Sequence, residues 1–166
     1  AMPNTPAMIQ AGATGLHAGE GVSKEQKNLA ESILRAVGLT CWIEDESLMD
    51  VVTAVSGSGP AYFFLVMEAL EDAACNMGLD AETARLLTLQ TALGAARMAM
   101  ESNDSPAILR ERVTSPGGTT ELALSILNQG KLRELFSTAL QGARQRSEEL
   151  SNILAKQKKL SNDNES

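Results

Sequence analysis

Apolar and polar positions follow two different patterns along the chain, and the pattern changes near residue 44. Before that point, residues 7–18 predict an irregular strand broken by two glycines, and residues 39–43 predict a short apolar strand. Between them, Ser23 and Gln26 predict a helix that begins with a capping box, and Gly38 predicts its end. This order is typical of the closing βαβ unit of an α/β sheet. Because so small a unit cannot cover both faces of its strands, we expect a preceding domain or another chain to cover them.

From residue 44 onward, apolar residues recur every three or four positions, which predicts helices only. The expected helices cover residues 47–55, 60–77, 81–102, 105–112, 120–130 and 132–155. Ser47, Asp80 and Ser105 are suited to begin three of them. Residues 61–70 are apolar nearly all round, so the second helix should be the buried centre of the helical part. Residues 156–166 form a polar tail, which we expect to be frayed or disordered.

Composition narrows the possible partners and sites. The 166 residues carry a net charge of −7, which argues against nucleic acid as the main partner. The longest uncharged apolar run, residues 60–67, is far shorter than the roughly 20 residues of a membrane span. Cys41 and Cys75 are expected to be buried free thiols of a cytosolic protein. His17 is the only histidine and has no metal-ligand spacing around it, so no metal site is predicted.

The stretch from Arg112 to Glu121 joins a glycine-rich turn to an apolar-periodic run. A helix start leaves N–H groups unpaired at the positive end of its dipole, which favours an anion. Gly117 and Gly118 allow the backbone to approach a ligand closely. Three hydroxyls can donate or accept hydrogen bonds there: Ser115, Thr119 and Thr120. The turn therefore suits a small carboxylate, although the same residue types also favour an ordinary helix N-cap, and the pattern alone names no ligand.

A second glycine motif runs from Gly57 to Tyr62 and invites comparison with the dinucleotide fingerprint G-x-G-x-x-G. It differs from the fingerprint because Tyr62 replaces the third glycine, a helix precedes it, and no acidic residue ends a strand about 20 residues later. A tight turn between two helices is the simplest interpretation. A functional role stays open, since Ser56 and Ser58 also lie beside a helix start.

Three stretches together resemble the pyrroline-5-carboxylate reductase family: residues 2–6, 52–62 and 113–120. They occur in the family's order and at about its spacing, and the resemblance covers residues 1–150. It implies a mainly α chain: a βαβ remnant of a Rossmann domain (residues 1–44), an all-helical dimerisation domain (45–155) and the polar tail (156–166). It also implies a cytoplasmic oxidoreductase that reduces 1-pyrroline-5-carboxylate to L-proline with NADPH or NADH.

The resemblance also implies roles for single residues. Substrate would be held by the turn residues Ser115, Gly117, Gly118, Thr119 and Thr120, with the Thr120 hydroxyl at the ring nitrogen in the catalytic position. Two further residues would line the same pocket: Glu46 and Thr53. Three would lie near the cofactor: Asn4, Thr5 and Arg112, the last at a position where some members of the family have an asparagine. Glu46 either favours an iminium charge or caps the helix at Ser47, and the sequence leaves both open.

The implied chemistry agrees with these residue types, because hydride addition to a cyclic imine needs orientation rather than a nucleophile or a metal. The chain alone should be inactive, since the phosphate-binding turn of the Rossmann domain is not in it. One alternative is a catalytically silent all-α dimerisation module. Another is a hydroxy-acid dehydrogenase, which would be expected to use a Lys or His that both motifs lack.

Assembly can be predicted from the apolar surface. The apolar second helix, an alanine-rich stripe on the third and the long apolar face of the last exceed what about 110 residues can cover. We therefore expect a two-fold homodimer, the commonest closed assembly, and the family resemblance implies the same.

Overall fold

The computed structural model of the chain describes residues 1–163, and contacts group them into two compact units. The first unit combines Ala1–Tyr62 with the chain from Phe136 onward, and the second is Phe63–Leu135. Helices dominate both, beside one small parallel sheet, as the sequence predicted. The division into domains at residue 44 stays a prediction, because these contacts group residues 45–62 with the sheet.

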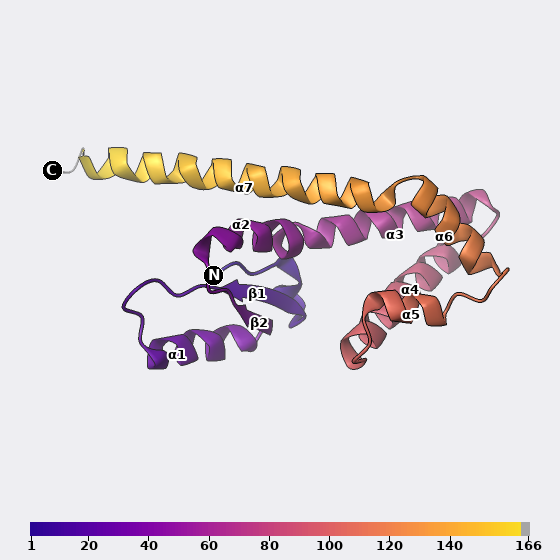
Figure 1. Cartoon of the computed structure of the whole chain (residues 1–166), viewed down its shortest axis with the longest axis horizontal. Helices are drawn as coiled ribbons and strands as arrows, with labels where there is room; N and C mark the ends of the chain where they lie inside the picture. Colours follow the sequence, from indigo (N-terminus) through magenta and orange to yellow (C-terminus); the bar gives the residue numbers. More distant parts are fainter. Residues whose placement is uncertain (164–166) are drawn as a thin grey trace. The chain divides into compact units, whose positions relative to one another are not determined.

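The predicted βαβ unit is present in the first unit (Figure 1). Strands β1 (Gly12–Leu16) and β2 (Gly38–Trp42) are parallel, and helix α1 (Lys24–Arg35) connects them. The capping box at the start of α1 is confirmed: Ser23 Oγ accepts from the Gln26 N–H, and the Gln26 side chain accepts from the Ser23 N–H. Local sequence therefore sets the position at which α1 begins.

The glycines of this sheet have a different role from the one predicted. The two glycines expected to break the first strand, Gly12 and Gly15, lie inside β1, and Gly38 begins β2 instead of ending α1. Gly12 and Gly38 are paired in the register, and Gly38 has a φ of +150°. A Cβ on Gly38 would lie 2.0 Å from the Gly12 carbonyl oxygen. Only glycine permits so close an approach of the two strands.

The chain after β2 is helical with little interruption. Its segments are η2 (Glu46–Leu48), α2 (Met49–Val52), η3 (Thr53–Gly57) and α3 (Gly59–Asn76). Asp45, not Ser47, caps the first of them, because its side chain accepts from the Ser47 N–H at 2.9 Å. The tight turn predicted between two helices is also wrong, since η3 is a turn of π-helix that leads on to α3.

Pro60 explains the π-helical turn. Proline has no N–H, and its ring clashes with the carbonyl four residues earlier, here that of Ser56. The Ser58 N–H donates to the Thr53 carbonyl five residues back, at 2.9 Å. The freed Ser56 carbonyl instead accepts from Asn4 Nδ2 at 3.2 Å, and Asn4 Oδ1 accepts from the Ala13 N–H at 2.8 Å. One amide side chain thus joins the start of the chain, β1 and the π-helical turn.

Helices of the second unit begin and end close to the predicted positions. They are the greater part of α3, followed by α4 (Ala81–Glu101), α5 (Pro106–Arg112), α6 (Thr119–Gln129) and the start of α7 (Leu132–Asp163). The caps at Asp80 and Ser105 are confirmed, since their side chains accept backbone N–H groups of α4 and α5. The tail predicted to be frayed from residue 156 is helical as far as Asp163, and residues 164–166 lie outside the described part.

Helix α3 is not the buried centre that its sequence predicted. In the single chain, Phe63, Phe64 and Leu65 are each more than 60% exposed. Cys41 and Cys75 are free thiols, as expected, but both are exposed and not buried. A single chain of this size cannot cover these apolar residues itself, which agrees with the excess of apolar surface that the sequence predicted.

The continuous helical segment Glu46–Asn76 is long and apolar enough to cross a membrane, judged by length and composition. The uncharged run at residues 60–67 predicted otherwise, because that run ends at Glu68, whereas mean hydropathy over a longer window tolerates a few charged residues. Length and composition are weak evidence by themselves, since a helix from the core of an oligomer passes the same test.

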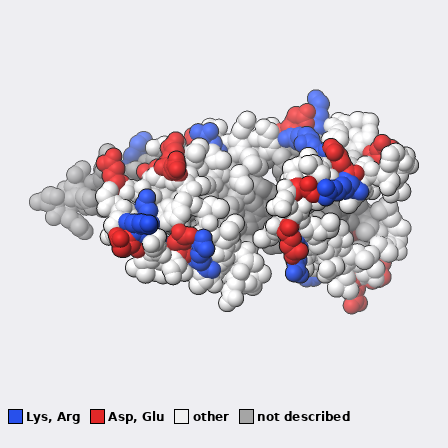
Figure 2. All heavy atoms as spheres, turned by 60° about the horizontal axis from the view of Figure 1, so that its bottom comes forward, with Lys and Arg blue, Asp and Glu red and all other residues white. Residues whose placement is uncertain are grey.

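Charged side chains are mixed on the face of the molecule shown in Figure 2, where basic groups lie beside acidic ones. On α7, Arg144 Nε lies 2.8 Å from Glu148 Oε1, and Arg146 Nη1 lies 2.8 Å from Glu149 Oε2. Exposed pairs of this kind contribute only about 0–1 kcal/mol each, so they support solubility more than stability.

The contact between Asn4 and Ser56 can be tested with a double-mutant cycle. Asn4→Ala should lower the free energy of unfolding by about 1–3 kcal/mol, because the Ser56 carbonyl and the Ala13 N–H lose their partner. Pro60→Ala restores an N–H that can reach Ser56, so the cost of Asn4→Ala should fall by about 1 kcal/mol in that background. Urea unfolding of the wild type, the two single variants and the double variant, all at one protein concentration, measures the cost of Asn4→Ala in both backgrounds. Equal costs in the two backgrounds would refute this origin of the π-helical turn.

Candidate functional site

The glycine-rich stretch between α5 and α6 forms a turn that leads into a helix, and the structure defines the type of this turn. The Gly118 N–H donates to the Ser115 carbonyl at 3.0 Å, which closes a four-residue turn. Gly117 has a φ of +72°. Proline at the second position and glycine with positive φ at the third are the signature of a type II turn. The turn leads directly into the first residue of α6, Thr119.

Donor groups at the start of α6 have no partner within the described residues. Gly118 is the N-cap, and it has no side chain to cap the helix. The alternative that a hydroxyl of the turn serves as N-cap is therefore wrong. No hydrogen bond within the described part of the chain involves the hydroxyls of Ser115, Thr119 or Thr120, or the N–H groups of Thr119 and Thr120. These groups can donate hydrogen bonds to an anion and orient it.

Glu121 is a site residue that the sequence analysis missed. Its carboxylate oxygen Oε2 accepts from the Gly117 N–H at 2.7 Å. An acidic residue at the third helical position often reaches back in this way, as in a capping box. That spacing was available in the sequence as a signal. The contact fixes the turn from the helix side.

Arg112, predicted near the cofactor, lies at the end of α5 and forms an ion pair with Asp104. Asp104 also accepts from the Ser102 hydroxyl at 3.3 Å. Because its guanidinium is held by this carboxylate, Arg112 is not a free cation beside the turn.

Glu46 and Thr53, predicted to line the substrate pocket, both lie in the first unit. The Glu46 side chain is 84% exposed, and its Oε2 lies 4.0 Å from His17 Nε2. Capping can be excluded for Glu46, because the cap is Asp45, and the hydrogen bonds from Ser47 lower the pKa of that carboxyl. The Thr53 hydroxyl donates to the Met49 carbonyl at 3.0 Å. The turn belongs to the second unit, so a pocket shared with these two residues stays a prediction.

Asn4 and Thr5, predicted beside the nicotinamide, differ in their surroundings. The Asn4 amide is used for contacts to Ser56 and Ala13, whereas Thr5 is exposed at the start of η1 (Thr5–Ile9). Asn4 therefore holds the start of the chain against β1 and η3, whereas the exposed Thr5 is accessible to a ligand.

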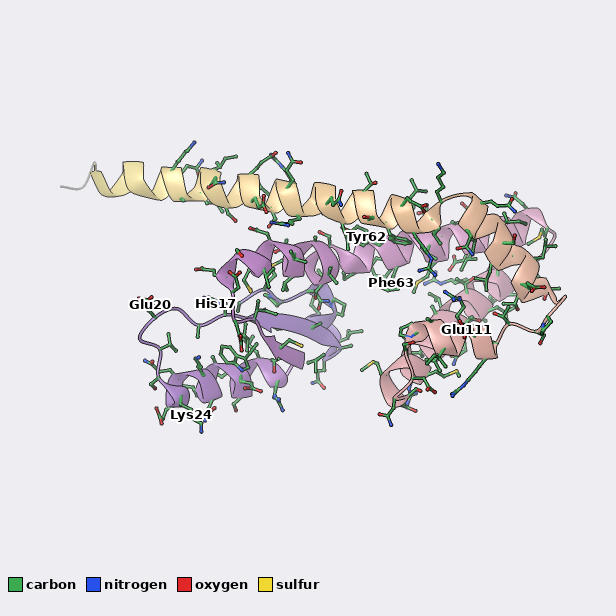
Figure 3. All side chains as sticks on the ribbon, in the orientation of Figure 1. His17, Glu20, Lys24, Tyr62, Phe63 and Glu111 are labelled. Carbon is green, nitrogen blue, oxygen red and sulfur yellow. The ribbon has the colours of Figure 1, made fainter. Side chains whose placement is uncertain are left out.

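The connection from β1 to α1 does not fit a pyrophosphate group. It carries Gly19 and Gly21 but places Glu20 between them, and Figure 3 labels Glu20 and, at the start of α1, Lys24. The capping box already takes up two N–H groups at the start of α1, those of Ser23 and Gln26. An acidic residue and an occupied helix start both disfavour a phosphate.

A concavity of about 590 Å³ lies beside α5 and α6. It is lined by Arg110, Glu111, Thr114, Glu121, Leu124, Ser125, Asn128 and Gln129. None of the three hydroxyls of the turn faces it. In the single chain, Ser115 and Thr119 are exposed and Thr120 is half-buried.

Comparison with known proteins agrees with the sequence motifs. Residues 46–150 match the family profile described as pyrroline-5-carboxylate reductase dimerisation. The chain is 54% identical to a pyrroline-5-carboxylate reductase from Pseudomonas aeruginosa, over 92% of this chain and 56% of the relative. The identity to the enzyme of that name from Pasteurella multocida is 49%, with the same coverage. The chain thus spans about half the length of the curated relatives that it matches.

Solved structures extend the agreement to the fold. A pyrroline-5-carboxylate reductase from Coxiella burnetii superposes with a TM-score of 0.88 at 60% identity, over 90% of this chain and 55% of that one. Pyrroline carboxylate reductase from Plasmodium falciparum, solved with NADP bound, gives 0.82 at 33% identity, over 88% and 59% of the two chains.

Proposed function

We propose that this chain, which belongs to the pyrroline-5-carboxylate reductase family, supplies the substrate-binding and dimerisation half of an enzyme that reduces 1-pyrroline-5-carboxylate to L-proline. The observation that carries this proposal is the open turn at the start of α6, with its free N–H groups and hydroxyls. The substrate combines a carboxylate with a ring nitrogen. The N–H groups of Thr119 and Thr120 suit the carboxylate, and the Thr120 hydroxyl suits the nitrogen.

The residues of the turn have the task of orientation. NADPH or NADH, when bound, supplies the hydride that adds to the C=N carbon. Protonation of the ring nitrogen makes that carbon electrophilic, and the Thr120 hydroxyl holds the nitrogen in one direction. Holding the ring in a reactive geometry accounts for much of the barrier reduction in such a step. Hydride addition to the C=N carbon requires no nucleophilic side chain, so the turn needs only to orient the ring.

The remaining residues have supporting roles in this proposal. The exposed Glu46 carboxylate would favour the iminium charge, and Thr53 would line the same pocket. Asn4 would hold the loop that presents Thr5 to the nicotinamide. Arg112 would approach the cofactor while paired with Asp104. The main cofactor site would lie in a nucleotide-binding half, because the βαβ unit of this chain does not fit pyrophosphate.

We propose a cytoplasmic homodimer as the working form. The matched profile is that of a dimerisation domain, and the apolar side chains of α3 are exposed in the single chain. Exposed apolar surface on this scale marks an interaction site, and a second copy is the simplest partner.

Joining this chain to the nucleotide-binding half of the Pseudomonas aeruginosa relative tests the activity. The fused protein should oxidise NADPH or NADH when pyrroline-5-carboxylate is added, and L-proline should form in equal amount. The 166-residue chain alone is the control, and it should show neither turnover nor saturable cofactor binding. An inactive but folded fusion would favour the alternative function, a catalytically silent dimerisation module. Turnover by the chain alone would refute the division of roles.

Substitution of Thr120 tests the proposed contact to the ring nitrogen. In the fused enzyme, Thr120→Ala should lower kcat/KM about ten- to a hundredfold, because it removes one hydrogen bond to a charged group. Thr120→Ser keeps a hydroxyl and serves as the matched control, with most of the activity retained. Steady-state kinetics measure the loss of the substrate contact, and a thermal melt shows whether the variant is still folded. An unchanged kcat/KM in Thr120→Ala would show that the hydroxyl does not act on the substrate.

The dimer can be tested on this chain directly. Its thermal midpoint should rise with protein concentration, because folding and association are coupled. Phe63→Glu, at an exposed position of α3 labelled in Figure 3, should weaken the dimer. Met8→Glu, at an even more exposed apolar position, in η1, is the control and should not. Sedimentation equilibrium that finds a folded monomer at low micromolar concentration would reject the dimer.

A further inference from the structure

We propose that Glu121 is a positioning residue, which holds the substrate turn in the one backbone orientation that leaves its donors free for substrate. The inference rests on the proposed function of the turn. It begins from one contact, the 2.7 Å hydrogen bond from the Gly117 N–H to Glu121 Oε2. The carboxylate lies on α6, and the N–H belongs to the peptide between Pro116 and Gly117.

That peptide is the part of the turn that its closing hydrogen bond does not fix. Type I and type II turns share the bond from the fourth N–H to the first carbonyl and differ by a rotation of the central peptide. Here the closing bond runs from Gly118 to Ser115. The φ of +72° at Gly117 belongs to the type II orientation. Glu121 binds the N–H of this central peptide, so its contact selects that orientation.

Fixing the central peptide also decides which donors remain for a ligand. The Gly117 N–H is taken by Glu121 and the Gly118 N–H by Ser115. The next three N–H groups, those of Thr119, Thr120 and Glu121, are left at the positive end of the α6 dipole. The first two are the donors that the proposed function assigns to the substrate carboxylate. A turn with a rotated central peptide would present a different set.

The negative charge of Glu121 acts against substrate binding, because a carboxylate in the first turn repels another anion at the helix start. The residue is exposed, so water and salt screen this repulsion. The hydrogen bond is direct and charge-assisted, and such bonds are stronger than neutral ones. Positioning should therefore outweigh repulsion, so removing the Glu121 carboxylate should lower kcat/KM and not raise it.

Steady-state kinetics of the fused enzyme test whether kcat/KM falls when Glu121 is removed. Glu121→Ala should lower kcat/KM about tenfold, mainly through a higher KM, because a charge-assisted hydrogen bond that orients the binding groups is lost. Glu121→Gln keeps an oxygen that can accept from the Gly117 N–H, so it should restore most of the loss. Glu82→Ala removes an acidic residue from the first turn of α4 and is the matched control, with unchanged kinetics. A kcat/KM at or above the wild-type value in Glu121→Ala, or equal losses in both Glu121 variants, would overturn the proposal.

Exchange of the Gly117 amide hydrogen gives a second readout that needs no activity. In the 166-residue chain, this amide should exchange about tenfold faster in Glu121→Ala than in the wild type, with Glu121→Gln close to the wild type. The same rate in all three proteins would also overturn the proposal. An inactive wild-type fusion would instead refute the proposed function, and the amide exchange would still decide whether Glu121 holds the turn.

Discussion

The architecture of the first unit depends on an N–H group that Pro60 does not have. An α-helix that passed through residue 60 would use this group to satisfy the Ser56 carbonyl. Without it, the helix widens to a π-turn, and the carbonyl is satisfied by Asn4, 52 positions earlier in the chain. Asn4 also binds the backbone of β1 at Ala13. Because Pro60 lacks a donor, Asn4 connects three segments: the start of the chain, β1 and the π-helical turn η3. This contact holds η3, which carries Thr53, in place.

A second constraint is the excess of apolar surface over what a single chain can bury. Helix α3 exposes both of its phenylalanines, and both cysteines of the chain are exposed as well. Such a helix gains its main stabilisation only when another surface covers it, because propensity alone contributes little. The family profile for dimerisation covers residues 46–150, which include this helix. Folding and assembly of this part of the chain are therefore expected to be one process.

Local features could be predicted from the sequence, whereas features that depend on distant partners could not. The caps at Ser23 and Asp80 need only a side chain and an N–H a few residues later, so their positions were correct. The π-turn needs Asn4, which no local pattern connects with Pro60. The apolar sequence of α3 predicted a partner surface, but it could not show which side chains one chain leaves exposed. The substrate turn was found because its glycines and hydroxyls are adjacent. Glu121 was missed, although its spacing is local, because the hydroxyls of the turn were considered as its only capping groups.

The composition of the turn has a consequence for the proposed reaction. A free arginine would bind the substrate carboxylate strongly, in the ground state and the transition state alike, and such uniform binding does not speed the chemical step. Here the nearby Arg112 is paired with Asp104. The groups left to hold the carboxylate are neutral: two N–H groups and the hydroxyls. Neutral donors bind weakly but in fixed directions. A turn of this kind favours a precisely oriented ring over a tightly bound one, as hydride transfer to a flat C=N bond requires.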